Sequence, residues 1–233
     1  LYVKILLNMS IKKIIAFGSA KGGVGKSSIT ASIALSLSKN KRIGILDADV
    51  YGPNQNILFN INSKNKILNN QIQPAEVKNI KIISMGNILN YDQAAIWRGP
   101  MLSGAIKKLI HESNWGELDY LLIDMPPGTG DPYLTIFNEL NVNEFILICM
   151  PSELAMSDAH KTITLLKKLK INIFGYIYND IFNNNNDLDM NYFNLNNIKH
   201  LGTYMFDENL HNFNCDHYSD ISNQISKIIL SDV

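Results

Sequence analysis

The chain has 233 residues, enough for one large domain whose core needs neither disulfides nor a metal ion. Lys plus Arg and Asp plus Glu both number 21, and this balance excludes the strongly basic surface of proteins that coat nucleic acid. The two cysteines, Cys149 and Cys215, exclude a disulfide-built secreted domain and favour a reducing compartment, so we expect a cytoplasmic protein.

The chain opens with LYVKILLNMSIKK, whose apolar patch is too short to span a bilayer and lacks a signal-cleavage pattern. We interpret residues 1–13 as an N-terminal extension, with Met9 as a candidate start, and residues 14–233 as a single domain.

Short apolar runs then alternate with amphipathic helical patterns. Strands are predicted at 14–17, 41–49, 80–85, 119–124, 144–150, 173–178 and 201–206. Helices are predicted at 27–40, 100–112, 131–140, 152–169 and 219–230. This alternation predicts an α/β fold of three layers, in which helices flank a mostly parallel sheet. Two polar, Asn-rich stretches, 56–73 and 179–197, lack the pattern, and we interpret the second as a tolerant loop.

The segment AKGGVGKSS at 20–28 follows the first predicted strand and opens the first predicted helix, which is the context of a phosphate-binding loop. Glycines there let backbone N–H groups converge on phosphate oxygens at the start of a helix. Lys26 is expected to reach the β and γ phosphates, and the hydroxyl of Ser27 to ligate Mg²⁺. Lys21 marks the variant loop with a lysine at its second position. We assign nucleotide binding to Gly22, Gly23, Val24, Gly25, Lys26, Ser27 and Ser28.

Carboxylates end two of the predicted strands, Asp47 and Asp49 the second strand and Asp124 the fourth. Ligands of an open parallel sheet bind beyond the carboxyl ends of its strands. Phosphoryl transfer needs Mg²⁺ and a group that orients the attacking water. We therefore assign Asp47 and Asp124 to the Mg²⁺ site and Asp49 to the water. Asp47 and Asp49 would share one face if the strand continued through both.

Together the segments KGGVGKSS, DADVYGPN, WRGPM and WGELDYLLIDMPPGTGD resemble the Mrp/ApbC family of ATPases, the iron-sulfur cluster carriers. The resemblance covers about residues 14–177 and implies a P-loop NTPase of the deviant Walker A class, with ATP and Mg²⁺ as cofactors. It also implies a homodimer in which Lys21 reaches the partner's nucleotide and acts with Lys26 and Asp49 in catalysis. Asn179 becomes a candidate for adenine contact, whereas Arg98 in WRGPM is equally well explained as a surface residue.

The sequence departs from this family where cluster carriers have a CxxC pair. The corresponding stretch, DIFNNNNDLDMNYFN at 180–194, contains no cysteine, and an iron-sulfur cluster normally needs four thiolates. Cys149 lies in an apolar run and is best explained as a small buried hydrophobe. Cys215, near His211 and His217, leaves open a metal site shared across a dimer.

The resemblance implies a Mg²⁺-dependent ATPase of iron-sulfur cluster assembly or transfer, with apo-protein clients and without nucleic acid or stable membrane association. The alternative is a positioning or partitioning ATPase of the MinD or ParA type, which needs a basic surface or a basic amphipathic C-terminal helix. The final SDISNQISKIILSDV has isoleucines at helical spacing but one lysine, which supports membrane anchoring only weakly. A third hypothesis, an ATP-binding module that does not hydrolyse, conflicts with the retained carboxylates.

Overall fold

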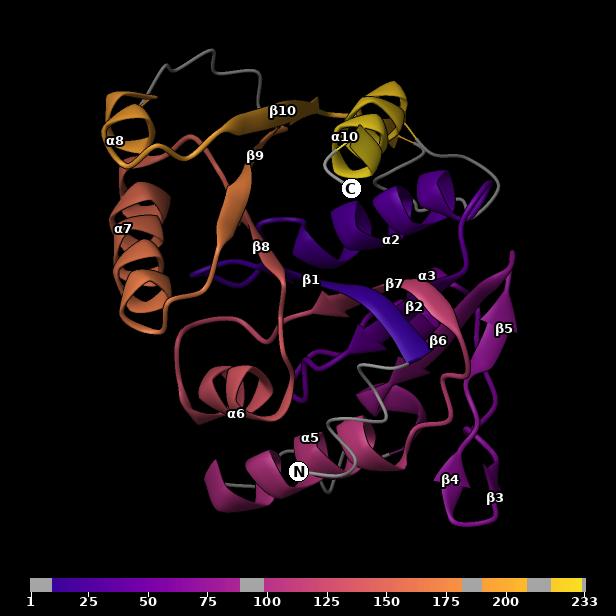
Figure 1. Cartoon of the computed structure of the whole chain (residues 1–233). Coiled ribbons are helices and arrows are strands. Elements are labelled where there is room, and N and C mark those ends of the chain that lie inside the picture. Colours follow the sequence, from indigo (N-terminus) through magenta and orange to yellow (C-terminus); the bar gives the residue numbers. More distant parts are fainter. Residues whose placement is uncertain (1–9, 89–98, 182–189, 209–218, 232–233) are drawn as a thin grey trace.

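The structure is a computed structural model that describes residues 10–88, 99–181, 190–208 and 219–231. Within these residues an eight-stranded sheet forms the centre, in the order β10-β9-β8-β1-β7-β2-β6-β5 (Figure 1). Neighbouring strands are parallel except β5, which pairs antiparallel with β6 at one edge. Its strands are β1 (Ile11–Gly18), β2 (Ile43–Asp47), β5 (Ala75–Val77), β6 (Ile80–Ser84), β7 (Leu118–Asp124), β8 (Glu144–Cys149), β9 (Ile173–Asp180) and β10 (His200–Met205).

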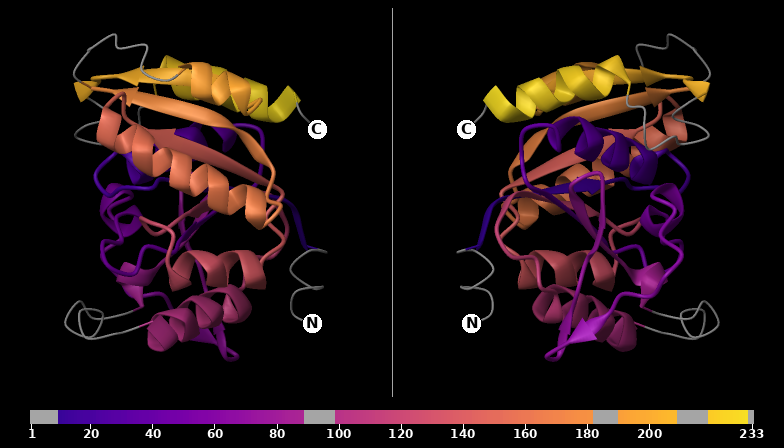
Figure 2. Two further views of the ribbon diagram at one scale, coloured as in Figure 1. Left: turned by 90° about the vertical axis from the view of Figure 1, so that its left-hand side faces the viewer. Right: turned by 90° about the vertical axis from the view of Figure 1, so that its right-hand side faces the viewer.

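Helices cover both faces of this sheet, as Figure 2 shows. They are α2 (Lys26–Leu37), α3 (Gln55–Leu58), α5 (Gly99–Glu112), α6 (Asp131–Glu139), α7 (Glu153–Lys168), α8 (Met190–Leu195) and α10 (Asp220–Ser231). None of the helices among the described residues combines the length and the apolar character needed to cross a membrane.

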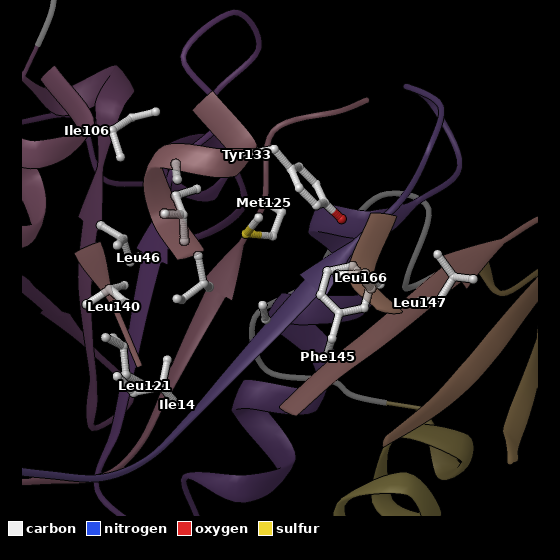
Figure 3. Close-up of a cluster of buried hydrophobic side chains, with 14 of the residues drawn as sticks. Ile14, Leu46, Ile106, Leu121, Met125, Tyr133, Leu140, Phe145, Leu147 and Leu166 are labelled. Atoms are coloured by element: carbon white, nitrogen blue, oxygen red, sulfur yellow. The ribbon is translucent and has the colours of Figure 1, made fainter. Parts of the chain in front are cut away.

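The central strand β1 shows why the fold has three layers. Ile14 and Ala16 belong to a core cluster with α5, α6 and α7 on one face (Figure 3). Ile15 and Phe17, which alternate with them, belong to a second cluster with α2 and α10 on the other face. A strand buried on both faces is a continuous apolar run, since successive side chains point to opposite sides. The predicted three-layer α/β architecture is therefore confirmed.

Helix α2 is buried on nearly every side, because it lies between the sheet and α10 (Figure 2). A buried cluster of hydroxyl groups joins the two helices and β10. The hydroxyl of Ser222 lies 2.6 Å from that of Ser32 on α2 and 2.8 Å from that of Tyr204 on β10. These polar groups satisfy one another inside an apolar layer, which fixes how α10 sits on α2.

The predicted strands and helices are all present, and their ends differ by a few residues. Five short features were missed: β5, α3, α8, the 3-10 helix η1 (Met85–Asn87) and a hairpin of β3 (Ile67–Leu68) and β4 (Gln71–Ile72). Most of them lie in the two Asn-rich stretches, where no hydrophobic period signals an element. The predicted domain boundary at residue 14 stays a prediction. Positions outside the described residues include Arg98, His211, Cys215 and His217.

The start of β7 is tied to its surroundings through Asp119. The Asp119 carboxylate accepts a hydrogen bond from the backbone N–H of Arg42 at 2.8 Å and pairs with Lys12 Nζ at 2.8 Å. The interaction with Lys12, followed by those with Arg42, holds the pKa of Asp119 well below its ordinary value. The ionised form of this carboxylate therefore stabilises the fold.

We expect Asp119→Asn to lower the free energy of unfolding by about 1 kcal/mol at pH 7, the upper end for exposed ion pairs. Because folding lowers the pKa of Asp119, its contribution is present above the unfolded-state pKa of about 3.9 and is lost as the pH falls through the folded-state value. Urea unfolding of both proteins at pH 7 and near pH 3 measures whether the difference shrinks.

The matched control is Asp158→Asn, because Asp158 pairs only across one helical turn of α7 with the exposed Lys161, at 2.9 Å. We expect less than about 0.5 kcal/mol from it. A difference between wild type and Asp119→Asn that stays constant with pH would contradict the prediction.

Candidate functional site: a phosphate loop and its carboxylates

The candidate phosphate loop lies at the centre of the sheet. It connects β1 to α2, and β1 has β7 on one side and β8 on the other, so the strand order reverses there. Gly23 and Gly25 adopt φ values of 78° and 82°, the left-handed region that favours glycine. The N–H groups of the first turn of a helix have no partner within it. The loop thus brings unpaired donors to the topological switch point, where ligands bind in such sheets.

A cavity of about 330 Å³ opens against this loop, within the range of small-molecule sites. Every loop residue assigned to nucleotide binding lines it except Val24, and Lys21 and Asp49 line it too. Its other lining residues, which sequence reasoning missed, are Ser19, Asn54, Ile57, Leu58 and Pro127. Asp47, Asp124 and Asn179 are not part of the lining.

Three polar side chains stand in one row across neighbouring strand ends. Asp47 of β2 is in register with Asp124 of β7 on one side and with Ser84 of β6 on the other. The prediction that strand-end carboxylates gather at one edge is correct for Asp47 and Asp124. Ser84 was missed. The same rule finds it, because Ser84 is the last residue but one of the next predicted strand, 80–85.

Asp124 is fully buried and makes an ion pair with Lys26, whose side chain is 7% exposed. The other carboxylate oxygen accepts a hydrogen bond from Gln55 Nε2 at 2.8 Å. A buried charge is stable only when it is paired and hydrogen-bonded. The lysine predicted to bind phosphate is therefore the counter-charge of the predicted Mg²⁺ ligand.

Asp47 uses both carboxylate oxygens to hold the segment that follows β2. One oxygen accepts from the backbone N–H of Asp49 at 3.2 Å, and the other from Gln55 N–H at 3.0 Å and Ser84 Oγ at 2.8 Å. Burial, followed by the charge of Asp124, raises the pKa of Asp47 to about 7. Asp47 thus positions the segment after β2, and its part in the metal site stays a prediction.

The strand does not continue through both Asp47 and Asp49, which was the condition for their side chains to share one face. Strand β2 ends at Asp47, and the Asp49 carboxylate accepts from the N–H groups of Tyr51 and Gly52 at 3.2 and 3.1 Å. A short carboxylate that caps a turn in this way competes with the strand ladder, which explains the early end. Burial raises the pKa of Asp49, and its side chain lines the cavity. Its assignment to the attacking water stays a prediction.

Asn179 lies against the loop from the side of β9. Its Nδ2 donates to the carbonyl of Val24 at 2.9 Å, and a Cβ added at Gly25 would collide with it. The side chain thereby fixes the shape of the loop, and its predicted adenine contact stays a prediction.

The thiol of Cys149 is buried in β8, and burial raises its pKa. No group of three or more His, Cys, Asp or Glu side chains in the described part of the chain lies close enough to hold a metal ion. The interpretation of Cys149 as a buried hydrophobe agrees with this environment.

Gln55 is the residue that sequence reasoning missed most clearly. It is fully buried and contacts Asp124, Asp47 and the carbonyl of Ser27, which Nε2 reaches at 3.0 Å. Its position in the turn-rich segment YGPNQN predicts an exposed polar residue, and no local pattern signals the burial.

Comparison with known proteins gives one family. The model described as ParA, NUBPL iron-transfer P-loop NTPase, matches residues 10–224. An iron-sulfur cluster carrier protein of Rickettsia bellii is 44% identical over 179 residues, which are 76% of this chain and 56% of that protein. The Arabidopsis thaliana iron-sulfur protein required for NADH dehydrogenase is 40% identical, over 72% of this chain and 55% of its own length. The chain thus spans little more than half the length of these relatives.

Solved structures agree on the fold. A nucleotide-binding protein of Archaeoglobus fulgidus in complex with ADP is 27% identical, with a TM-score of 0.73 over 97% of this chain and 93% of that one. The cell division ATPase MinD of Pyrococcus furiosus has a TM-score of 0.74 at 17% identity, over 95% of this chain and 99% of its own. These structures confirm the predicted P-loop NTPase fold, and the family model and the curated relatives confirm the resemblance to iron-sulfur cluster carriers.

The ion pair between Lys26 and Asp124 should contribute to the stability of the fold. We expect Lys26→Met to lower the free energy of unfolding by about 3 kcal/mol without nucleotide, because it leaves the buried Asp124 without its counter-charge. Lys21→Met, the same change at an exposed position of the same loop, is the control and should cost less than about 0.5 kcal/mol. Denaturant-induced unfolding measures both, and equal effects would contradict a stabilising role for the pair.

Proposed function

The chain belongs to the NUBPL iron-transfer P-loop NTPase family, and on that premise we propose that it is a Mg²⁺-dependent ATPase that acts in iron-sulfur cluster assembly or transfer. The observation that carries the proposal is the cavity at the switch point, where the phosphate loop, Lys21 and Asp49 share one lining.

The residues at this cavity fit a magnesium nucleotide. Mg²⁺ prefers oxygen ligands and is usually held by one or two carboxylates, substrate phosphates and several waters. Ser27 supplies a hydroxyl on the cavity wall, and Asp124 supplies a carboxylate that already touches the neighbouring Lys26. When bound, the ion neutralises charge on the phosphates. We assign the metal site to Ser27 and Asp124, with Asp47 behind them.

Lys26 has two states in this proposal. Without nucleotide it pairs with Asp124, as the structure has it. With nucleotide it turns to the β and γ phosphates, and Asp124 becomes free to face the magnesium ion. One positive charge is thus exchanged for another beside the same carboxylate, so binding leaves no buried charge unpaired.

Asp49 and Lys21 carry the catalytic assignments. Asp49 orients the attacking water, which is consistent with its place on the cavity wall and with a carboxylate that two backbone N–H groups hold in position. Lys21 is exposed at the loop, and we assign it to the nucleotide of a second copy in a homodimer. A charge supplied in this way contributes roughly 10³ to 10⁵ in rate in related phosphoryl transfer.

The proposed role concerns iron-sulfur clusters and the apo-proteins that receive them. The names of the relatives support a role with iron-sulfur apo-protein clients. We place this role in the cytoplasm, because a content of two cysteines suits a reducing compartment. Cys149 is unsuited as a ligand, since its thiol is buried and its pKa raised.

The MinD or ParA alternative has the support of fold alone. It needs a basic surface or a basic amphipathic C-terminal helix whose apolar side is free to bind a membrane. In α10 this side is occupied, because Ile225 and Ile229 are fully buried against the core and Ile221 and Ile228 pack beside them.

We expect the purified chain to hydrolyse ATP in the presence of Mg²⁺. Asp49→Ala should slow hydrolysis by about 10²-fold or more and Lys21→Ala by about 10³-fold, while nucleotide binding is kept. Lys26→Ala should weaken nucleotide binding itself. Phosphate release and the binding of a fluorescent nucleotide measure these effects separately, with the exposed Lys41→Ala as control. Hydrolysis that Lys26→Ala and Asp49→Ala leave unchanged would disprove the mechanism.

A separate experiment tests whether the chain itself holds an iron-sulfur cluster. After anaerobic reconstitution with ferrous iron and sulfide, we expect this chain alone to retain no stable cluster, because a cluster normally needs four thiolates. Metal and sulfide analysis and the thiolate-to-iron absorption band measure retention, beside a Cys215→Ser variant. A band that appears in the wild type and is lost in Cys215→Ser would show instead that two copies of the chain share a metal site.

A further inference from the structure

We propose that Gln55 is a positioning residue for the magnesium site, whose side-chain carbonyl accepts a hydrogen bond from a water molecule on the nucleotide's Mg²⁺. The inference rests on the proposed function. It starts from a fully buried side chain whose Oε1 has no hydrogen-bond partner. A buried acceptor without a partner is costly, and it calls for an explanation.

The contacts of Gln55 place it between the three residues assigned to the metal. Its Nε2 donates to Asp124 at 2.8 Å and to the carbonyl of Ser27 at 3.0 Å, and its backbone N–H donates to Asp47 at 3.0 Å. Its side chain and its backbone together thus bond Gln55 to all three residues.

The orientation of the amide is fixed by chemistry. Both partners of Nε2, a carboxylate oxygen and a backbone carbonyl, can only accept hydrogen bonds. The amide nitrogen must therefore face them, since the flipped group would set oxygen against oxygen. The atom left without a partner is for this reason an acceptor, on the amide group that already contacts Asp124.

The missing partner must be a donor, which restricts its identity. The oxygens of an ionised phosphate only accept hydrogen bonds, so the phosphate groups of a nucleotide leave Oε1 unsatisfied. Mg²⁺ loses its waters reluctantly and keeps several of them when it is bound to a nucleotide, and these waters are donors. Gln55 would then hold the metal through water and Asp124 through Nε2, and the same amide would serve both the free and the loaded site.

Two variants at position 55 separate the acceptor from the donor. Gln55→Met keeps the unbranched shape and removes both polar atoms, whereas Gln55→Glu keeps an acceptor and removes the donor at neutral pH. Gln71→Leu changes an exposed glutamine on β4 and is the control. The readout is the gain in affinity for a fluorescent ADP analogue when Mg²⁺ replaces EDTA, together with thermal unfolding of each variant without Mg²⁺.

In EDTA we expect Gln55→Met and Gln71→Leu to bind the analogue like the wild type, within about twofold. Gln55→Glu should bind it more weakly, because its added carboxylate repels Asp124 and the phosphates. Gln55→Met should lose about tenfold of the Mg²⁺-dependent gain, the effect of one hydrogen bond to a charged group, whereas Gln55→Glu and Gln71→Leu should keep it. A full gain in Gln55→Met, or an equal loss in Gln55→Met and Gln55→Glu, would overturn the inference and leave the proposed function intact. A wild type that does not bind the analogue in either condition would overturn both.

Discussion

The buried carboxylate of Asp124 is the group on which the candidate site depends. A charge that is fully removed from water must be compensated, and here the compensation comes from two segments distant in sequence, through Lys26 and Gln55. These partners hold the phosphate loop and the segment after β2 against the end of β7. The same interactions that stabilise this part of the fold thus assemble the residues that a magnesium nucleotide would need.

The parallel topology of the sheet explains how residues distant in sequence come together at the candidate site. Parallel strands end at one edge, so β6, β2 and β7 bring Ser84, Asp47 and Asp124 into one row without any long side chain. The reversal of strand order at β1 opens a crevice beside that row, and the phosphate loop enters it. Both faces of the sheet are covered by helices, which leaves the strand ends as the natural place for a ligand.

Much of this could be predicted from the sequence, and the misses have common causes. Long periodic segments gave reliable helices and strands, and a glycine-rich loop in the right context identified the cavity wall. The short elements β5, α3 and α8 have no period to detect. The end of β2 depends on a turn that Asp49 caps, and the burial of Gln55 depends on three partners from elsewhere in the chain. Local sequence contains neither kind of information.

The hydroxyl cluster between α2 and α10 has a consequence for binding thermodynamics. The helix that begins at Lys26 is held by the sheet on one side and through Ser32 and Ser222 on the other. Its first turn, which faces the cavity, is therefore ordered before any nucleotide arrives. Ordering a loop on binding consumes part of the interaction free energy, and a backbone that is preorganised keeps that part for affinity. Helix α10 thus stabilises, through α2, the backbone of the proposed phosphate site.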